Sequence, residues 1–225
     1  MPTYATLELG EPIDALAWQK GCESLGFKSA ASIMNPSPTV AELEAFFRTE
    51  PEWVYFSGHI SGTLLYAHQP GTTELQFKKD RVAIKDRVAF ATNAISVKYD
   101  ENARNLQKQT SEFTMHKRCL LVILGGCSAL GSLSTMKVIR ELFFNPTILG
   151  YAEQCDVTKN TAMMGGGSNP SHFFANIRSG ADLVNAWLQS GLSNYPSKQS
   201  MFRAFDPDGQ EWKLDASKVV KGTRV

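Results

Sequence analysis

Two side chains in this 225-residue sequence stand where an α/β protein places its reactive groups. Cys127 follows a very apolar run and two glycines, and His59 follows another apolar run and one glycine. A thiol with an ordinary pKa of about 8.5 is only a few per cent thiolate at neutral pH, and a nearby imidazole raises that fraction. The same imidazole can protonate a leaving amine. The pair predicts a cysteine hydrolase with Cys127 as nucleophile and His59 as base.

The residues beside this pair suit the same chemistry. Glycine lets the chain turn tightly and lets a substrate backbone come close, so we expect Gly126 and its neighbour Ser128 to bind substrate. An oxyanion hole needs backbone N–H groups aimed at the developing negative charge. We expect those donors at Gly58, Ile60 and Cys127.

The other cysteines and histidines have no comparable setting. Cys22 falls on a helical stripe and Cys119 begins an apolar run, so both are expected in the core, whereas Cys155 follows a strand end and is a weaker cleft candidate. No C-x-x-C pair is present, and the spacing matches neither a zinc site nor a dense disulfide framework. We therefore expect free thiols, no metal and no organic cofactor. The histidines without a strand-end setting are His68, His116 and His172.

Alternating strand-like and helix-like patterns predict the elements that position the pair. Strands are expected at 3–9, 29–34, 53–56, 119–124 and 147–151, and strand-like flanks surround a turn at 206–209. Helices are expected at 13–27, from a Thr39/Glu42 capping box onward, around 136–143, and at 173–177 and 183–188. Short hairpin-like runs are expected between 62 and 86, and a solvated helix or loop at 99–112.

This order predicts an open, mainly parallel α/β sheet with helices on both faces, in a single domain covering residues 1–225. The run at 119–124 is apolar throughout, as in a strand buried on both faces. Open α/β sheets bind ligands beyond the carboxyl ends of their strands. If the strands at 53–56 and 119–124 are parallel neighbours, His59 and Cys127 reach the same edge. The N-terminus of the helix that starts near Ser132 would favour a thiolate there.

Composition limits the classes of partner. Lys and Arg number 23 against 22 Asp and Glu, a net charge of +1, which predicts no electrostatic binding of nucleic acid or anionic membrane. The apolar stretch at 91–97 is too short to span a bilayer, and no secretory signal is recognisable at the N-terminus. The expected location is the cytoplasm, and the oligomeric state has no signal in the sequence.

The order of motifs resembles the caspase-like cysteine peptidases, particularly bacterial CHAT-type domains. In that group an apolar strand ends in a histidine motif, a hairpin-rich insertion follows, and a very apolar strand then ends in a short motif containing the cysteine. The matching segments span roughly residues 30–190: 54–59 (VYFSGH), 121–127 (LVILGGC), 147–151 (TILGY), an acidic position at Asp156 and a late helix at 181–187 (ADLVNAW).

The resemblance implies a Cys-His dyad endopeptidase that needs no cofactor and acts on a protein or peptide substrate. Two positions differ from the family pattern. Ile60 stands where the family usually has glycine after the histidine, and Gly125 stands where many members carry an acidic residue that binds a basic substrate side chain. Glu153 or Asp156 would then supply that charge as part of the substrate-binding site.

Three other interpretations stay open. Residues 125–129 are close to a nucleophile elbow, with Asp156 and His172 as acid and base of an α/β-hydrolase-like enzyme, although this leaves His59 unexplained. Residues 126–132 have the glycine spacing of a phosphate loop but lack its lysine. A catalytically inactive binding or scaffold protein of the same fold is the alternative from a different functional class.

Overall fold

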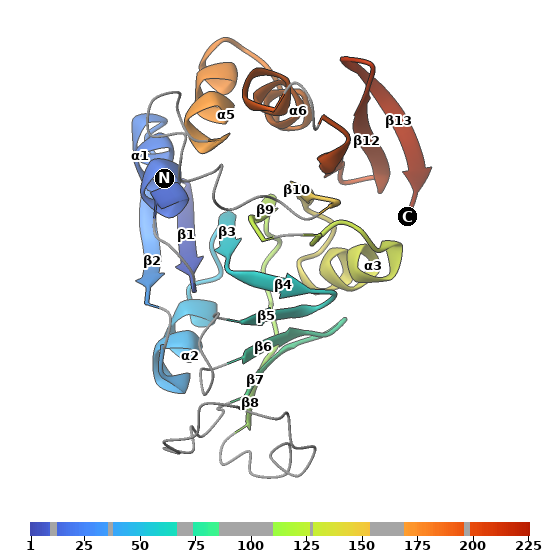
Figure 1. The fold of residues 1–225 in the computed structure, drawn as a ribbon. Helices are drawn as coiled ribbons and strands as arrows, with labels where there is room; N and C mark the ends of the chain where they lie inside the picture. Colours follow the sequence, from blue (N-terminus) through green and yellow to red (C-terminus); the bar gives the residue numbers. More distant parts are fainter. Residues whose placement is uncertain are drawn as a thin grey trace, which may run out of the picture.

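An eight-stranded sheet forms the centre of the computed structural model, which describes residues 1–9, 13–35, 38–66, 74–85, 110–126, 128–153, 169–195 and 199–225. The strand order is β13-β12-β11-β10-β9-β3-β1-β2 (Figure 1). The strands are β1 (Thr3–Glu8), β2 (Lys28–Met34), β3 (Trp53–Ser57), β9 (Leu121–Leu124), β10 (Thr147–Tyr151), β11 (Phe202–Phe205), β12 (Gln210–Asp215) and β13 (Lys218–Arg224). The five strands from β2 to β10 are parallel, and β11 to β13 are antiparallel.

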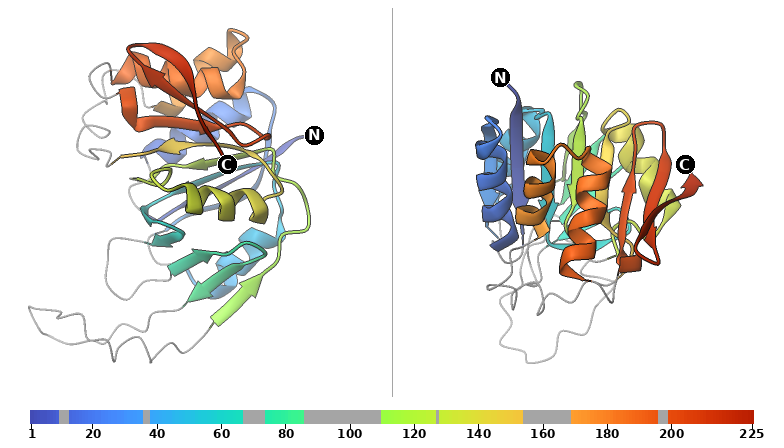
Figure 2. Two further views of the ribbon diagram at one scale, coloured as in Figure 1. Left: turned by 90° about the vertical axis from the view of Figure 1, so that its right-hand side faces the viewer. Right: turned by 90° about the horizontal axis from the view of Figure 1, so that it is seen from above.

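Helices cover both faces of this sheet, which confirms the expected α/β fold. Trp18 of α1 (Ile13–Ser24), Phe173 of α5 (Asn169–Arg178) and Trp187 of α6 (Leu183–Asn194) pack on one face. Leu43 of α2 (Val40–Arg48) and Met136 of α3 (Leu133–Leu142) pack on the other. In the left view of Figure 2 the sheet is seen edge-on, with α5 and α6 above it and α3 below it.

A second, antiparallel sheet lies on the α2 and α3 side of the main sheet, in the order β4-β5-β6-β7-β8. Its strands are β4 (His59–Ser61), β5 (Leu64–Tyr66), β6 (Glu74–Phe77), β7 (Val82–Lys85) and β8 (Thr110–Phe113). The hairpin-like runs predicted after residue 62 are therefore confirmed. The helix or loop predicted over 99–112 is wrong at its end, because residues 110–112 pair with β7; residues 99–109 lie outside the described part of the chain.

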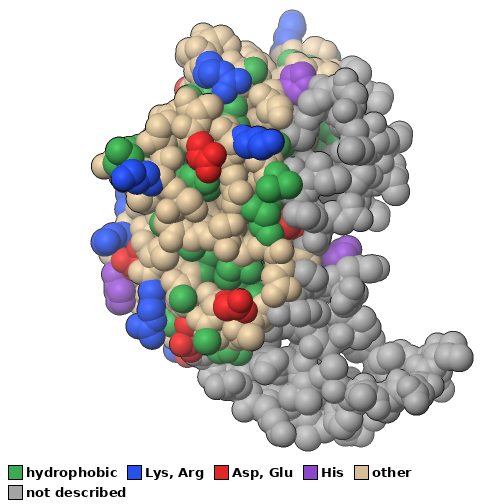
Figure 3. Space-filling model, turned by 90° about the vertical axis from the view of Figure 1, so that its left-hand side faces the viewer, with side chains coloured by type: hydrophobic (Ala, Val, Ile, Leu, Met, Phe, Trp, Pro, Cys, Tyr) green, Lys and Arg blue, Asp and Glu red, His purple; other side chains and the backbone are tan. Residues whose placement is uncertain are grey.

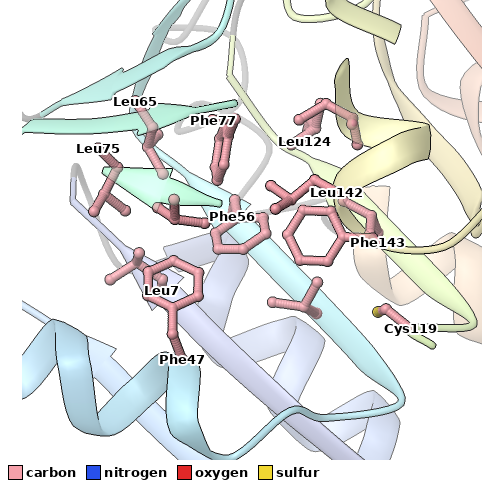
Figure 4. Close-up of a cluster of buried hydrophobic side chains, with 14 of the residues drawn as sticks. Leu7, Phe47, Phe56, Leu65, Leu75, Phe77, Cys119, Leu124, Leu142 and Phe143 are labelled. Atoms are coloured by element: carbon pink, nitrogen blue, oxygen red, sulfur yellow. The ribbon is translucent and has the colours of Figure 1, made fainter. Parts of the chain in front are cut away.

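The two sheets share one apolar core. Figure 4 shows Leu7, Phe56 and Leu124 of the main sheet meeting Leu65 and Phe77 of the second sheet. The rings of Phe56 and Phe77 lie 5.2 Å apart between centroids. Side chains from α2, α3 and the turn after α3 close the cluster: Phe47, Leu142 and Phe143. Since apolar surface from both sheets is buried in one place, the second sheet is held where β3 and β9 end.

A local signal accounts for the start of α2. Thr39 caps α2: its hydroxyl accepts a hydrogen bond from the Glu42 backbone N–H, and the Glu42 carboxylate accepts one from the Thr39 backbone N–H. The bond from the Thr39 backbone, with a second from its hydroxyl, holds the pKa of Glu42 below its ordinary value. This confirms the predicted capping box.

The strand predicted at 3–9 is confirmed as β1, and residues 4–9 are all buried because helices cover one face of β1 and the shared core covers the other. Two other local expectations need correction. Cys119 is buried but lies before β9, which begins at Leu121. The C-terminal strand β13 is absent from the predicted elements, because its sequence, KVVKGTR, is polar and lies at the edge of the sheet.

One face of the molecule carries charged side chains of both signs. On the face formed by α1, α2 and β2, Figure 3 shows basic and acidic side chains mixed among the described residues rather than gathered by sign. None of the helices in the described ranges is both long and apolar enough to cross a membrane.

Candidate active site

The strands that precede the predicted base and nucleophile are parallel neighbours. β3 pairs with β9 in the register Phe56↔Leu124, and the backbone N–H of Gly125 donates to the carbonyl of Phe56 at 2.7 Å. Both strands therefore reach the carboxyl edge of the sheet at the same level, which is where open α/β sheets bind ligands.

Gly58 lets the chain leave the main sheet at this edge. Its φ of 144° lies in a region that side chains with a Cβ rarely adopt, so glycine is required at this position. Immediately afterwards, β4 begins at His59 and runs toward α3 (Figure 1). The predicted base thus stands on the corner between the two sheets, where its side chain is half-buried.

Gly126 is packed directly against this corner. A Cβ added to Gly126 would lie 2.5 Å from the carbonyl oxygen of Gly58 and 2.5 Å from Cγ1 of Ile60. Contacts this short exclude a larger residue. The segments that carry His59 and Cys127 are therefore in van der Waals contact through residues 58, 60 and 126.

The chain beyond the nucleophile position folds into a tight turn fixed to the end of β10. The Ser128 backbone N–H donates to the Glu153 carbonyl at 2.9 Å, and the Leu130 N–H donates to the Tyr151 carbonyl at 2.8 Å. Ser128 itself has a φ of 55°, in the left-handed region that costs a non-glycine residue about 1–3 kcal/mol. Such strained positions cluster at functional sites, where the surrounding hydrogen bonds maintain them.

The N-terminus of α3 lies close to the same corner. The Thr135 hydroxyl oxygen is 3.9 Å from the point where a Cβ on Gly62 would stand, which places the first turn of α3 beside the β4–β5 turn. Ser132 occupies the N-cap position without a side-chain cap hydrogen bond, and the first turn contains no acidic residue. The partial positive charge of this helix end therefore has no carboxylate within the first turn to offset it.

Most of the residues predicted for the site come together. Gly58, His59, Ile60 and Gly126 meet at the corner, while Ser128 and Glu153 are joined by a backbone hydrogen bond, with the Glu153 side chain exposed. Two further predictions concern residues outside the described ranges: Cys127, as nucleophile and oxyanion donor, and Asp156, as a substrate-binding acid. Cys155 and His68 also lie outside them.

Hydrogen bonds already made at the edge narrow the choice of oxyanion donors. The backbone N–H groups of Gly125 and Ser128 are both used within the fold. They are therefore not donors for a substrate oxygen, and the predicted donors at Cys127 and Ile60 stay predictions. Ile60 is only 8% exposed, and its side chain packs in the core shared by the two sheets and against Gly126.

The two described cysteines are core residues, as predicted. Cys22 on α1 and Cys119 before β9 are both buried. Burial disfavours the charged thiolate, so it raises the pKa of Cys22 far above the ordinary value and that of Cys119 to about 12. Neither thiol is suited to act as a nucleophile near neutral pH.

One acidic residue at this edge is not anticipated by the sequence patterns. Glu8 ends β1, is 1% exposed and is the register partner of Ser57 on β3. The alternation at 3–9 is typical of a strand with one face in water, which makes a glutamate there unremarkable. The signal lies in the topology instead: a strand between two parallel neighbours is buried on both faces.

A buried chain of polar side chains lies further along the same edge. Asn169 of α5 donates to the Tyr151 hydroxyl at 2.5 Å and accepts a hydrogen bond from Asn194 of α6 at 2.6 Å. Asn169 is 4% exposed and Tyr151 is 3% exposed, so the bond between them is buried, whereas Asn194 is half-buried.

Within the described ranges, no group of three or more His, Cys, Asp or Glu side chains is arranged to hold a metal ion. His172, the base of the alternative hydrolase arrangement, lies in the first turn of α5.

Comparison with known proteins finds no significant match among protein families, curated protein sequences or solved structures.

Proposed function

We propose that this protein is a cysteine endopeptidase that uses Cys127 as nucleophile and His59 as general base and acid. The observation that carries the proposal is the contact of Gly126 with Gly58 and Ile60. It brings the backbone on either side of His59 against the residue that immediately precedes Cys127, at the edge where α/β enzymes bind substrate.

The proposed reaction is acyl transfer through a thioester. The Cys127 thiolate attacks the carbonyl carbon of a peptide bond, and the carbonyl oxygen becomes an oxyanion held by backbone N–H groups. The C–N bond then breaks as imidazolium His59 transfers its proton to the leaving amine. His59 next takes a proton from water, whose oxygen attacks the thioester and releases the acid and the Cys127 thiolate.

The electrostatics of the edge support this role for Cys127. The uncapped N-terminus of α3 favours negative charge nearby, and its first turn holds no carboxylate. The strained Ser128 directly after the nucleophile position is held by its bond to Glu153. The turn therefore holds the chain directly after the nucleophile position in place, which supports the positioning that catalysis by Cys127 would need.

The order of elements supports a caspase-like peptidase. The third strand leads into His59, an antiparallel hairpin sheet follows, and the strand that pairs with β3 leads into the glycines before Cys127. On this proposal the substrate is a protein or peptide, no organic cofactor takes part, and the protein acts in the cytoplasm.

Cleavage of a mixed peptide pool tests this function. The wild-type chain should produce new peptide termini detectable by mass spectrometry, and Cys127→Ala should produce none because the sulfur that forms the thioester is gone. Cys22→Ala is the matched control, since it removes a buried sulfur from α1 and should retain cleavage. Cleavage by Cys127→Ala would show that another group is the nucleophile, and an inert wild-type chain would favour a binding protein.

A further inference from the structure

The two edges of the main sheet differ in their charged side chains. β13 forms one edge and carries cations at positions 218, 221 and 224 (Figure 1). β2 forms the opposite edge, and its only charged residue is Lys28 at its start. In the described part of the chain, β2 pairs with β1 alone, so its outer edge leaves backbone N–H and C=O groups available to another strand. Charged side chains keep other strands from pairing with an edge, and the middle of β2 has none.

The middle of β2 is suited to pair with a second copy of itself. Residues 29–32, Ser-Ala-Ala-Ser, read the same in both directions, so antiparallel pairing about their centre places Ser29 opposite Ser32 of the second copy. Side chains that lie opposite each other in an antiparallel pair share a face of the sheet. Ser29 is aligned with Tyr4. Ser32 is aligned with Thr6, which lies on the same face of β1 as Tyr4, so the two serines meet this condition.

Two hydrogen bonds show how α1 lies along this part of β2. Gln19 donates to the Ser32 hydroxyl oxygen at 2.6 Å. One helical turn later, Glu23 accepts a hydrogen bond at 3.1 Å from Tyr4, the register partner of Ser29. Residues 19 and 23 of α1 are therefore level with residues 32 and 29 of β2.

The charges on α1 are complementary across the twofold axis of this pairing. An axis through the centre of residues 29–32 brings residue 23 of one α1 level with residue 19 of the other. Lys20 follows Gln19 directly, and Lys20 and Glu23 are both exposed. Each copy then presents a cation opposite an anion of the other, and the symmetry makes this match twice. This complementarity favours a second copy of the chain over an unrelated strand.

We propose that β2 is a homodimer interface, in which two copies of the chain join their main sheets edge to edge. In this dimer β2 is antiparallel to β2 of the second copy, the two α1 helices lie on the same face, and Lys20 is opposite Glu23 of the second copy. The interface is independent of the proposed peptidase activity.

Size-exclusion chromatography with light scattering tests the interface. The wild-type chain should have twice the single-chain mass of 24.8 kDa at high protein concentration. Ser29→Lys places a charge in the middle of β2 and should give the single-chain mass. Thr223→Lys is the matched control at an exposed position of β13 and should stay dimeric. A wild-type chain with the single-chain mass at every concentration, or a dimer that Ser29→Lys leaves intact, would overturn the proposal.

A charge exchange on α1 tests the orientation of the two copies. Lys20→Glu replaces both opposite-charge pairs across the axis with like-charge pairs, so the dissociation constant of the dimer should rise about tenfold. Lys20→Glu/Glu23→Lys should restore the dimer, because opposite charges face each other again. Circular dichroism identifies any variant that has unfolded. A double variant that dimerises as weakly as Lys20→Glu would refute this arrangement.

Hydrogen–deuterium exchange locates the interface without a variant. The backbone N–H groups of β2 should exchange more slowly in the dimer than in the single chain, compared at the concentrations where light scattering records each. Those of β13 should exchange at the same rate in both. Slower exchange in β13, with β2 unchanged, would mean that the dimer forms through the opposite edge and would overturn the proposal.

Discussion

Glycines let two distant chain segments touch at the site. Gly58 takes a backbone conformation that other residues rarely adopt, and Gly126 leaves no room for a Cβ against the Gly58 carbonyl. Gly125 is similarly constrained, since a Cβ there would lie 2.7 Å from the Tyr55 hydroxyl oxygen. The corner therefore depends on the absence of side chains at three positions.

Replacement of Gly126 by alanine should separate the two segments. We expect a loss of about 1–3 kcal/mol in the free energy of unfolding, measured by urea denaturation, together with slower labelling of Cys127. Adding Ile60→Ala should not restore either property, because the Gly58 carbonyl is backbone and stays in place. Gly26→Ala is the control: Gly26 also has a positive φ, 81°, but no atom would lie within 4 Å of the new Cβ, so labelling should be unaffected. Full rescue by Ile60→Ala would contradict this account of the corner.

Buried acids make the fold sensitive to high pH. Burial raises the pKa of Cys119 to about 12 from 9.0 and that of Tyr4 to about 12 from 10.0, and it raises the pKa of Cys22 as well. These groups stay neutral when folded but ionise in the unfolded chain above pH 9 to 10. Their contribution is fully present below that range and is lost as pH rises toward 12.

The free energy of unfolding should therefore fall between pH 8 and pH 11, as measured by urea denaturation at each pH. Cys22→Ala should make this fall less steep, because one of the groups that ionise only on unfolding is gone. A free energy of unfolding that is constant over this range would be inconsistent with the burial of these three side chains.

Close packing between α1 and α5 fixes the helical layer on one face of the main sheet. A Cβ added to Gly21 on α1 would lie 1.9 Å from Cδ2 of Phe174 on α5. Phe174 in turn packs against Trp18, with 5.1 Å between ring centroids. The two helices are therefore closer at Gly21 than any side chain would allow, and they cover the sheet as one unit.

Gly21→Ala should reverse the usual effect of this substitution. In an ordinary helix, alanine is more favourable than glycine by about 0.5–1 kcal/mol. Here we expect a loss of about 1–3 kcal/mol in urea denaturation, because the new methyl group overlaps a buried ring. The double variant Gly21→Ala/Phe174→Leu should be more stable than the sum of its single effects predicts. Stabilisation by Gly21→Ala alone would show that α1 and α5 are less closely packed.

Sequence patterns predict helices and strands well where the structure depends on neighbouring residues in the sequence alone. The apolar run before Gly125 indicates a strand buried on both faces, and Thr39 with Glu42 marks a helix start in the sequence alone. The end of the 99–112 segment was predicted wrongly as helix or loop, because β8 depends on pairing with β7 rather than on local composition. Glu8 was missed for a related reason, since its burial comes from the strands and helices that surround β1.

At the scale of the whole molecule, the shared core makes the second sheet part of the main fold. Leu65 and Leu75 of the second sheet are fully buried in the cluster that holds Leu7 and Phe56 of the main sheet. The site lies on the boundary between the two sheets, so its geometry depends on their mutual packing. We therefore predict that the two sheets fold together as a single domain.

Unfolding monitored by tryptophan tests that prediction. The four tryptophans are at positions 18, 53, 187 and 212, on the main sheet and its helices, so none reports on the second sheet directly. Leu65→Ala in the second sheet should cost about 2–5 kcal/mol and should shift the tryptophan fluorescence and far-UV circular dichroism transitions together. Two separate transitions, with the tryptophan transition unmoved, would mean that the sheets unfold independently.

The central claim is that the His59 imidazole controls the reactivity of the Cys127 sulfur. It is tested most directly by the rate of iodoacetamide labelling at each cysteine near pH 7, followed by peptide mapping. We expect Cys127 to label fastest and Cys22 and Cys119 to stay unmodified in the folded protein, with His59→Ala slowing Cys127 by about tenfold or more and His172→Ala leaving it unchanged. Equal, slow labelling of Cys127 in the wild type and in His59→Ala would contradict the account.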